Sequence, residues 1–88
     1  FLHTGLSSWL RERGVETVVI AGVMTHICVD STARDAFQLG FDVVVVSDAC
    51  ASKHRELHNA SLLTLSHAVA RVASSPDVIA ALAAGGRC

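Results

Sequence analysis

The 88-residue chain has few charged residues and no strongly basic or acidic segment. Asp, Glu, Lys and Arg make up 17% of the residues, and the formal net charge is −1. The charges stand in short mixed groups, such as RER at 11–13 and KHRE at 53–56. The sequence therefore lacks the clustered basic residues that bind nucleic acid or an anionic membrane, and we expect neither partner.

Long apolar runs and paired cysteines are also missing. No run approaches the roughly 18 apolar residues that span a bilayer, and the first residues do not form a secretory signal pattern. The three cysteines, Cys28, Cys50 and Cys88, are an odd number without CxxC spacing. This pattern argues against a disulfide framework and against a zinc ribbon. We therefore expect a soluble, cytoplasmic protein in a reducing compartment.

Apolar residues, by contrast, are abundant. They make up 51% of the chain, and the mean hydropathy is +0.47, which is enough for one small core. The chain begins with Phe1 rather than methionine, and unbroken apolar strands normally belong to a larger sheet. We therefore expect residues 1–88 to form a single partial domain.

Hydrophobic periodicity predicts helices alternating with strands along the whole chain. Because the two clearest strands are uninterrupted apolar runs separated by a helix, they indicate a parallel sheet that is buried by helices on both faces. The expected elements are a helix over 2–13, a strand over 16–21, a helix over 28–39, a strand over 42–47, a helix over 54–66, a short strand within 68–73 and a final helix that begins near 75–76.

Several single residues mark where the helices begin and end. Gly14 and Gly40 follow helical segments, where a glycine cap is common. Ser75 followed by Pro76 is typical of an N-cap and a first helical position. Trp9 is expected in the core between the first helix and the sheet.

Cys28 stands between an apolar strand and an amphipathic helix. Val18 to Ile20 form a strand that Gly22 ends, and helical periodicity starts at Val29. At the start of a helix, free backbone N–H groups and the helix dipole stabilise a thiolate, and they can also hold the oxyanion of an acyl-transfer reaction. The alternative is a buried structural cysteine, a common role for free Cys.

The segment GVMTHICVDSTARDA, followed by GFDVVVVSDACAS, resembles the isochorismatase-like cysteine hydrolases, which include nicotinamidases and related amidases. The resemblance covers nearly the whole chain and corresponds to the C-terminal half of that domain. It implies a Rossmann-like, three-layer α/β/α fold with a parallel sheet. It also implies a Cys, Asp, Lys triad with Cys28 as the catalytic cysteine.

The resemblance implies further features of the site. It implies a cis peptide between Val23 and Met24, and an oxyanion hole made by the backbone N–H groups of Met24 and Cys28. The triad Asp and Lys would both precede Phe1, and Lys53, the only lysine, follows the second strand and cannot replace the missing one.

The intact protein is therefore expected to hydrolyse a small amide through a thioester on Cys28 and to form a homo-oligomer. The 88-residue chain alone is expected to be inactive. The alternatives are a catalytically incompetent fragment or a non-enzymatic binding module, and a thiol-based redox protein that uses Cys28 without a triad.

Other polar residues near Cys28 have two interpretations each. Thr25 and His26 could line the substrate pocket. The Thr25 hydroxyl could equally make a local helix-cap bond, and His26 could instead act as a base. Asp48, in the expected loop over 48–52, could orient the active-site loop or cap a helix.

No cofactor and no metal site are expected in this chain. His54 and His58 are four residues apart on one helix, but two ligands need a third. The zinc of nicotinamidases in this family is bound by residues of the missing half, so a zinc ion there stays open.

Overall fold

A computed structural model describes residues 4–83 as alternating helices and strands. The elements follow the expected order, with one π-helical turn, η1, inserted before the second α-helix. They are α1 (Leu6–Glu12), β1 (Thr17–Val23), η1 (Thr25–Val29), α2 (Asp30–Gln38), β2 (Asp42–Ala51), α3 (Arg55–Ala68), β3 (Arg71–Ala73) and α4 (Ser75–Ala83).

Within the described residues the strands form one parallel sheet in the order β1-β2-β3. Because parallel strands run in one direction, their carboxyl ends meet at the same edge of the sheet. At that edge Val23 of β1 pairs with Ala51 of β2. The segments that follow these two strands, η1 and the β2–α3 loop, therefore begin side by side.

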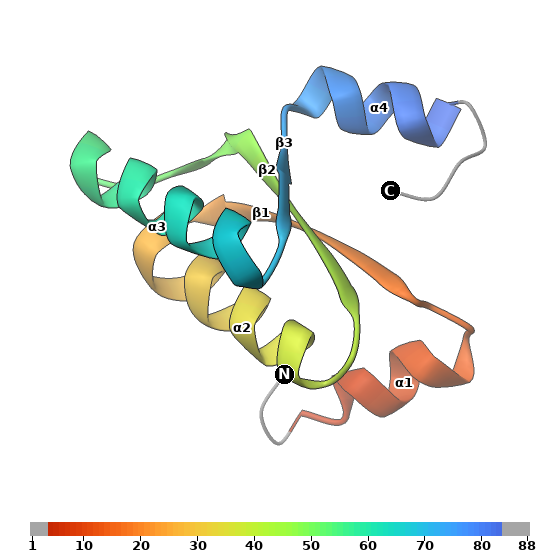
Figure 1. Cartoon of the computed structure of the whole chain (residues 1–88). Coiled ribbons are helices and arrows are strands. Elements are labelled where there is room, and N and C mark those ends of the chain that lie inside the picture. Colours follow the sequence, from red (N-terminus) through yellow and green to blue (C-terminus); the bar gives the residue numbers. More distant parts are fainter. Residues whose placement is uncertain (1–3, 84–88) are drawn as a thin grey trace.

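Helices cover the two faces of the sheet to different extents. On one face, Val43 and Val45 of β2 pack with Ala33 of α2 and Leu65 of α3. On the other face, Val44 and Val46 pack with Val78 of α4. Figure 1 shows α2 and α3 together on one side of the sheet and α4 on the other. The expected α/β fold with a parallel sheet between helical layers is thereby confirmed.

Strand β2 is longer than the sequence predicts. The expected strand ends at Ser47, whereas β2 continues to Ala51, so most of the expected loop over 48–52 is strand. The reason is the pairing with β1, which is interrupted between Ile20 and Gly22 and resumes where Gly22 pairs with Cys50. Gly22 has φ 131°, a conformation that L side chains rarely adopt.

Strand β1 was expected to be buried, and it is only partly covered. Val18 and Ile20 pack against the core beneath α2 and α3. Val19 and Val23 lie on the opposite face and are 44% and 67% exposed. This difference arises because α4 packs on β2 in that layer, and no other described helix covers β1 there.

Two expectations about the helices were wrong. Trp9 is 51% exposed instead of lying in the core: α1 turns Leu10 toward the core, and the Arg13 guanidinium lies over the indole, 3.7 Å from the ring centroid. The cap of α4 is Ser74 rather than Ser75, since the Ser74 hydroxyl accepts a hydrogen bond from the backbone N–H of Asp77 at 3.5 Å.

The helix expected over 2–13 begins at Leu6 in the described part of the chain, after Gly5 in the left-handed conformation. Residues 2 and 3, at the start of that expected helix, lie outside the described residues. None of the helices within 4–83 is both long and apolar enough to cross a bilayer.

Candidate active site

Cys28 lies in η1, directly after the carboxyl end of β1. Met24, the residue before η1, has an extended backbone (φ −97°, ψ 146°). Its carbonyl accepts hydrogen bonds from the N–H groups of Ile27 at 3.1 Å and Val29 at 3.2 Å. The peptide bond between Val23 and Met24 is cis, at the position that the resemblance implied. Since Asp30 directly follows Val29 in the αR conformation, η1 continues into α2 without a break.

The structure distinguishes clearly between Cys28 and Cys50. Cys28 is exposed, whereas Cys50 is buried. Cys28 is therefore not the buried structural cysteine of the alternative interpretation. Burial raises the pKa of the Cys50 thiol, because the low-dielectric surroundings disfavour the thiolate.

Thr25 is completely buried at the start of η1. Its hydroxyl oxygen is 2.7 Å from Nδ1 of His58 on α3, which satisfies a polar atom that would otherwise be costly to bury. The expectation that the Thr25 side chain lines a substrate pocket is corrected here, because a side chain with no exposed surface cannot contact a ligand.

His26 makes two contacts with a single hydroxyl on the β2–α3 loop. Its backbone N–H donates to Ser52 Oγ at 3.3 Å, and its ring atom Nδ1 lies 2.7 Å from the same oxygen. Since Ser52 Oγ already accepts one hydrogen bond, its own proton is available for Nδ1. His26 is half-buried.

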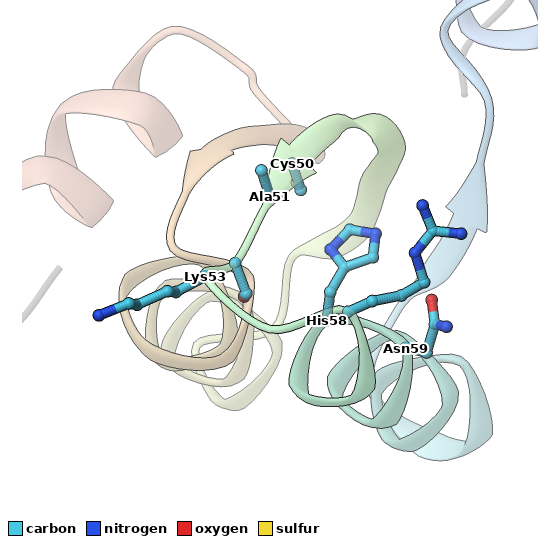
Figure 2. A pocket seen from close by; sticks show the side chains of 7 residues that line it. Cys50, Ala51, Lys53, His58 and Asn59 are labelled. Atoms are coloured by element: carbon cyan, nitrogen blue, oxygen red, sulfur yellow. The ribbon is translucent and has the colours of Figure 1, made fainter.

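A cavity of about 450 Å³ opens beside η1, between the end of β2 and the start of α3. Ser52 and His58, the hydrogen-bond partners of η1, both lie on its wall. Figure 2 shows Cys50 and Ala51 at the end of the strand, His58 and Asn59 on the helix, and Lys53 pointing away from His58. The lining residues are Cys50, Ala51, Ser52, Lys53, Arg55, His58 and Asn59.

Asp48 is tied to α4. Its carboxylate accepts hydrogen bonds from the backbone N–H and from the hydroxyl of Ser75, both at 2.7 Å. These two bonds lower the pKa of Asp48, because they stabilise the ionised carboxylate. Of the two interpretations from the sequence, the structure therefore favours the helix cap.

The described residues do not fit a metal site. His54 is the N-cap residue of α3, and Nδ1 of His58 is already bonded to Thr25. No group of three or more His, Cys, Asp or Glu side chains that could hold a metal ion occurs within residues 4–83.

No local pattern in the sequence indicates the contacts of Ser52 and His58 with η1. From the sequence, His58 is only one of two histidines on a helix that could bind a metal, and Ser52 is only part of the expected loop over 48–52. Their partners are 33 and 26 residues away, so only the fold brings them together.

Fold and site together define an α/β protein with an exposed cysteine at the carboxyl edge of a parallel sheet. Residues 1–77 match the Isochorismatase domain. The chain is 43% identical over 82 residues to the isochorismatase family protein YecD of Escherichia coli O157:H7, covering 93% of this chain and 44% of YecD. This chain belongs to the isochorismatase family.

Two further relatives agree with this assignment. Nicotinamidase 3 of Arabidopsis thaliana is 45% identical over 65 residues, which cover 74% of this chain and 33% of that protein. The crystal structure of an isochorismatase-like hydrolase from Alkaliphilus metalliredigens superimposes with a TM-score of 0.88 at 41% identity, covering 93% of this chain and 45% of that one. The chain thus spans about half the length of the relatives it matches.

Proposed function

We propose that this chain carries the nucleophile of an amide-hydrolysing enzyme and that the nucleophile is Cys28. The thiolate of Cys28 attacks the carbonyl carbon of a small amide and forms a tetrahedral intermediate. The intermediate collapses to a thioester as the C–N bond breaks and the protonated nitrogen leaves as ammonia or an amine. Water then hydrolyses the thioester, which gives a carboxylic acid and restores the thiol. The observation that carries this proposal is the exposure of Cys28 in the turn after β1.

The oxyanion hole in this proposal consists of the backbone N–H groups of Met24 and Cys28. Two features support it. Met24 stands directly before the first helical turn, where N–H groups lack partners within the helix. Backbone donors placed where negative charge develops are a major source of catalysis in acyl transfer.

The acid–base partners of Cys28 are proposed to come from sequence that precedes Phe1. Asp30 is paired with Arg34 on α2, and Lys53 points away from His58 in Figure 2. Residues 1–88 would then be the C-terminal portion of an isochorismatase-like hydrolase domain. In the intact protein the lysine stabilises the thiolate, and the aspartate transfers a proton to the leaving nitrogen.

The proposed substrate is a small amide, because a relative 45% identical over 65 residues is a nicotinamidase. His26 is the proposed pocket residue, since it is half-buried and two residues from Cys28. We further propose a homo-oligomer, which the high apolar content of the chain, 51%, favours. A cytoplasmic location suits cysteines that have no disulfide pattern.

The test is ammonia release from a panel of small amides by the protein expressed from the complete coding region. We expect Cys28→Ala to lower kcat by on the order of 10³-fold or more, whereas the matched control Cys50→Ala keeps most of the activity. Full activity in Cys28→Ala would refute the proposal. A protein that folds but releases no ammonia from any amide would favour the non-enzymatic alternative.

A further inference from the structure

Two consecutive residues of η1 are each joined to the segment around the β2–α3 loop by a short hydrogen bond. Thr25 pairs with His58 and His26 pairs with Ser52, each with 2.7 Å between a hydroxyl oxygen and an imidazole Nδ1. In the first pair η1 supplies the hydroxyl, and in the second it supplies the imidazole. We call these two contacts the imidazole–hydroxyl pairs.

The pairs connect the turn that bears Cys28 to two different elements. His58 lies on α3, and Ser52 lies just after the end of β2. Ser52 also accepts the backbone N–H of His26 at 3.3 Å, so the side chain and the main chain of His26 are fixed by one hydroxyl. The start of η1 is therefore bonded to two residues, Ser52 and His58, that line the neighbouring cavity.

Cys28 depends on this attachment because it shares a single turn with Thr25 and His26. The turn is a five-residue π-helix, a rare form that is frequent at functional sites. The Cys28 side chain is exposed, so packing within residues 4–83 does not hold it. The position of its sulfur is therefore set through the backbone of η1.

We infer that the imidazole–hydroxyl pairs are a positioning device for the Cys28 thiol, and that Ser52 and His58 are positioning residues for the reaction. This inference rests on the proposed function of Cys28 as nucleophile. Neither side chain needs to touch the substrate to have this effect. Displacement of a reacting group by about 1 Å can cost about 100-fold in rate, so loosening η1 should lower kcat more than it raises KM.

The simpler interpretation is that the pairs only stabilise the fold by satisfying polar atoms near the core. In that case their removal would lower overall stability without a selective effect on Cys28. A useful experiment must therefore measure the reactivity of Cys28 and the stability of the whole protein separately.

The primary variant is Ser52→Ala, which removes one hydroxyl on the cavity wall. Ser52→Thr keeps a hydroxyl and serves as the conservative rescue. Ser66→Ala is the matched control, because Ser66 bonds only within α3, to the carbonyl of Leu63. All variants are made in the protein expressed from the complete coding region.

A second set of variants tests His58. His58→Asn keeps an amide group near the position of Nδ1, whereas His58→Leu removes every polar atom and leaves the buried Thr25 hydroxyl without its partner. His67→Leu, at an exposed position on the same helix, is the control. Because His58→Leu can unfold the protein, Ser52→Ala keeps the test decisive.

Three readouts are compared for each variant: kcat and KM for amide hydrolysis, the iodoacetamide alkylation rate of Cys28, and the thermal midpoint of unfolding. For Ser52→Ala we expect kcat to fall about tenfold or more with KM changed less than about threefold. We also expect an altered Cys28 alkylation rate and a nearly unchanged midpoint. Ser52→Thr and Ser66→Ala should behave like the wild type.

The inference is overturned if Ser52→Ala, together with His58→Leu where that variant folds, retains wild-type kcat and Cys28 alkylation rates. It is equally overturned if kcat falls only in proportion to the loss of folded protein. These outcomes differ from failure of the proposed function, which is shown by undiminished hydrolysis in Cys28→Ala. The alkylation readout needs no substrate, so it separates the two failures even if no amide is turned over.

Discussion

Cys28 and Cys50 lie near the carboxyl ends of neighbouring parallel strands, yet their surroundings are opposite. After β1 the chain turns at once into η1, which leaves the Cys28 thiol exposed. Strand β2 instead continues to Ala51, and its pairing with Gly22 of β1 keeps Cys50 in the sheet, only 8% exposed. The comparison shows that the way in which each strand ends, rather than the residue type, decides which thiol a reactant can reach.

Two leucines on α3 test whether the core cluster that contains Cys50 is buried in the intact protein. Leu65 is 0% exposed and belongs to the same core cluster as Cys50, whereas Leu63 is 73% exposed. We expect Leu65→Ala to lower the free energy of unfolding by about 3 kcal/mol and Leu63→Ala to change it by under about 0.5 kcal/mol. Urea denaturation of the intact protein measures both. Equal losses would show that Leu63 is covered in the intact protein and that the exposed side of α3 is not a surface.

The thiols themselves provide the next test. Cys28 should react with iodoacetamide at neutral pH at least about tenfold faster than Cys50, because it is accessible and Cys50 is shielded. Peptide mass spectrometry after timed labelling gives both rates in one sample. Labelling of the two cysteines at the same rate would contradict the contrast between the strand ends.

The pH dependence of Cys50 labelling is a second test of the burial of that thiol. Since burial raises the pKa of Cys50, its thiolate forms at higher pH than that of an ordinary thiol. The labelling of Cys50 should therefore increase only well above pH 8.5, the usual range of a free cysteine. A free cysteine in a short unstructured peptide is the reference. A labelling profile for Cys50 that coincides with the reference would show that it is not buried in solution.

The smallest expected effect concerns Asp48, in the stretch of β2 that precedes Cys50. Its pKa is lowered in the folded state by the bonds from Ser75. Its contribution to stability is therefore complete above the pKa of the unfolded chain, about 3.9, and is lost as pH falls through the lower folded pKa. Asp48→Asn should slightly reduce the loss of stability between pH 5 and pH 3, because the exposed site is well screened.

Thermal unfolding across that pH range measures the effect, with the exposed Asp42→Asn as control. An identical acid response in wild type and Asp48→Asn would argue against the hydrogen bonds between Asp48 and Ser75 in the first turn of α4.

Local patterns in the sequence predicted most elements of the fold. Unbroken valine runs marked β2, and the glycines at 14 and 40, both with positive φ, marked the ends of helices. The prediction was wrong where tertiary pairing decided the outcome. The extension of β2 to Ala51 depends on Gly22, and the partial exposure of β1 depends on where α4 packs, neither of which a local pattern contains.

Only those features of the candidate site that lie within one short segment could be predicted from the sequence. The position of Cys28 at a strand-to-helix turn follows from the change of hydrophobic period, and the structure confirms that position. The burial of Thr25 and the contacts of His26 with Ser52 arise between segments 26 or more residues apart. A single sequence does not show which distant residues meet, so these contacts required the fold.

Trapping the covalent intermediate is the sharpest test of whether the Cys28 sulfur attacks the substrate carbonyl. The intact protein is mixed with a small amide substrate, quenched in acid within one turnover and digested for mass spectrometry. We expect an acyl group, bound as a thioester, on the peptide that contains Cys28. An acyl group on Cys50 or another side chain, or turnover that persists in Cys28→Ala, would contradict it.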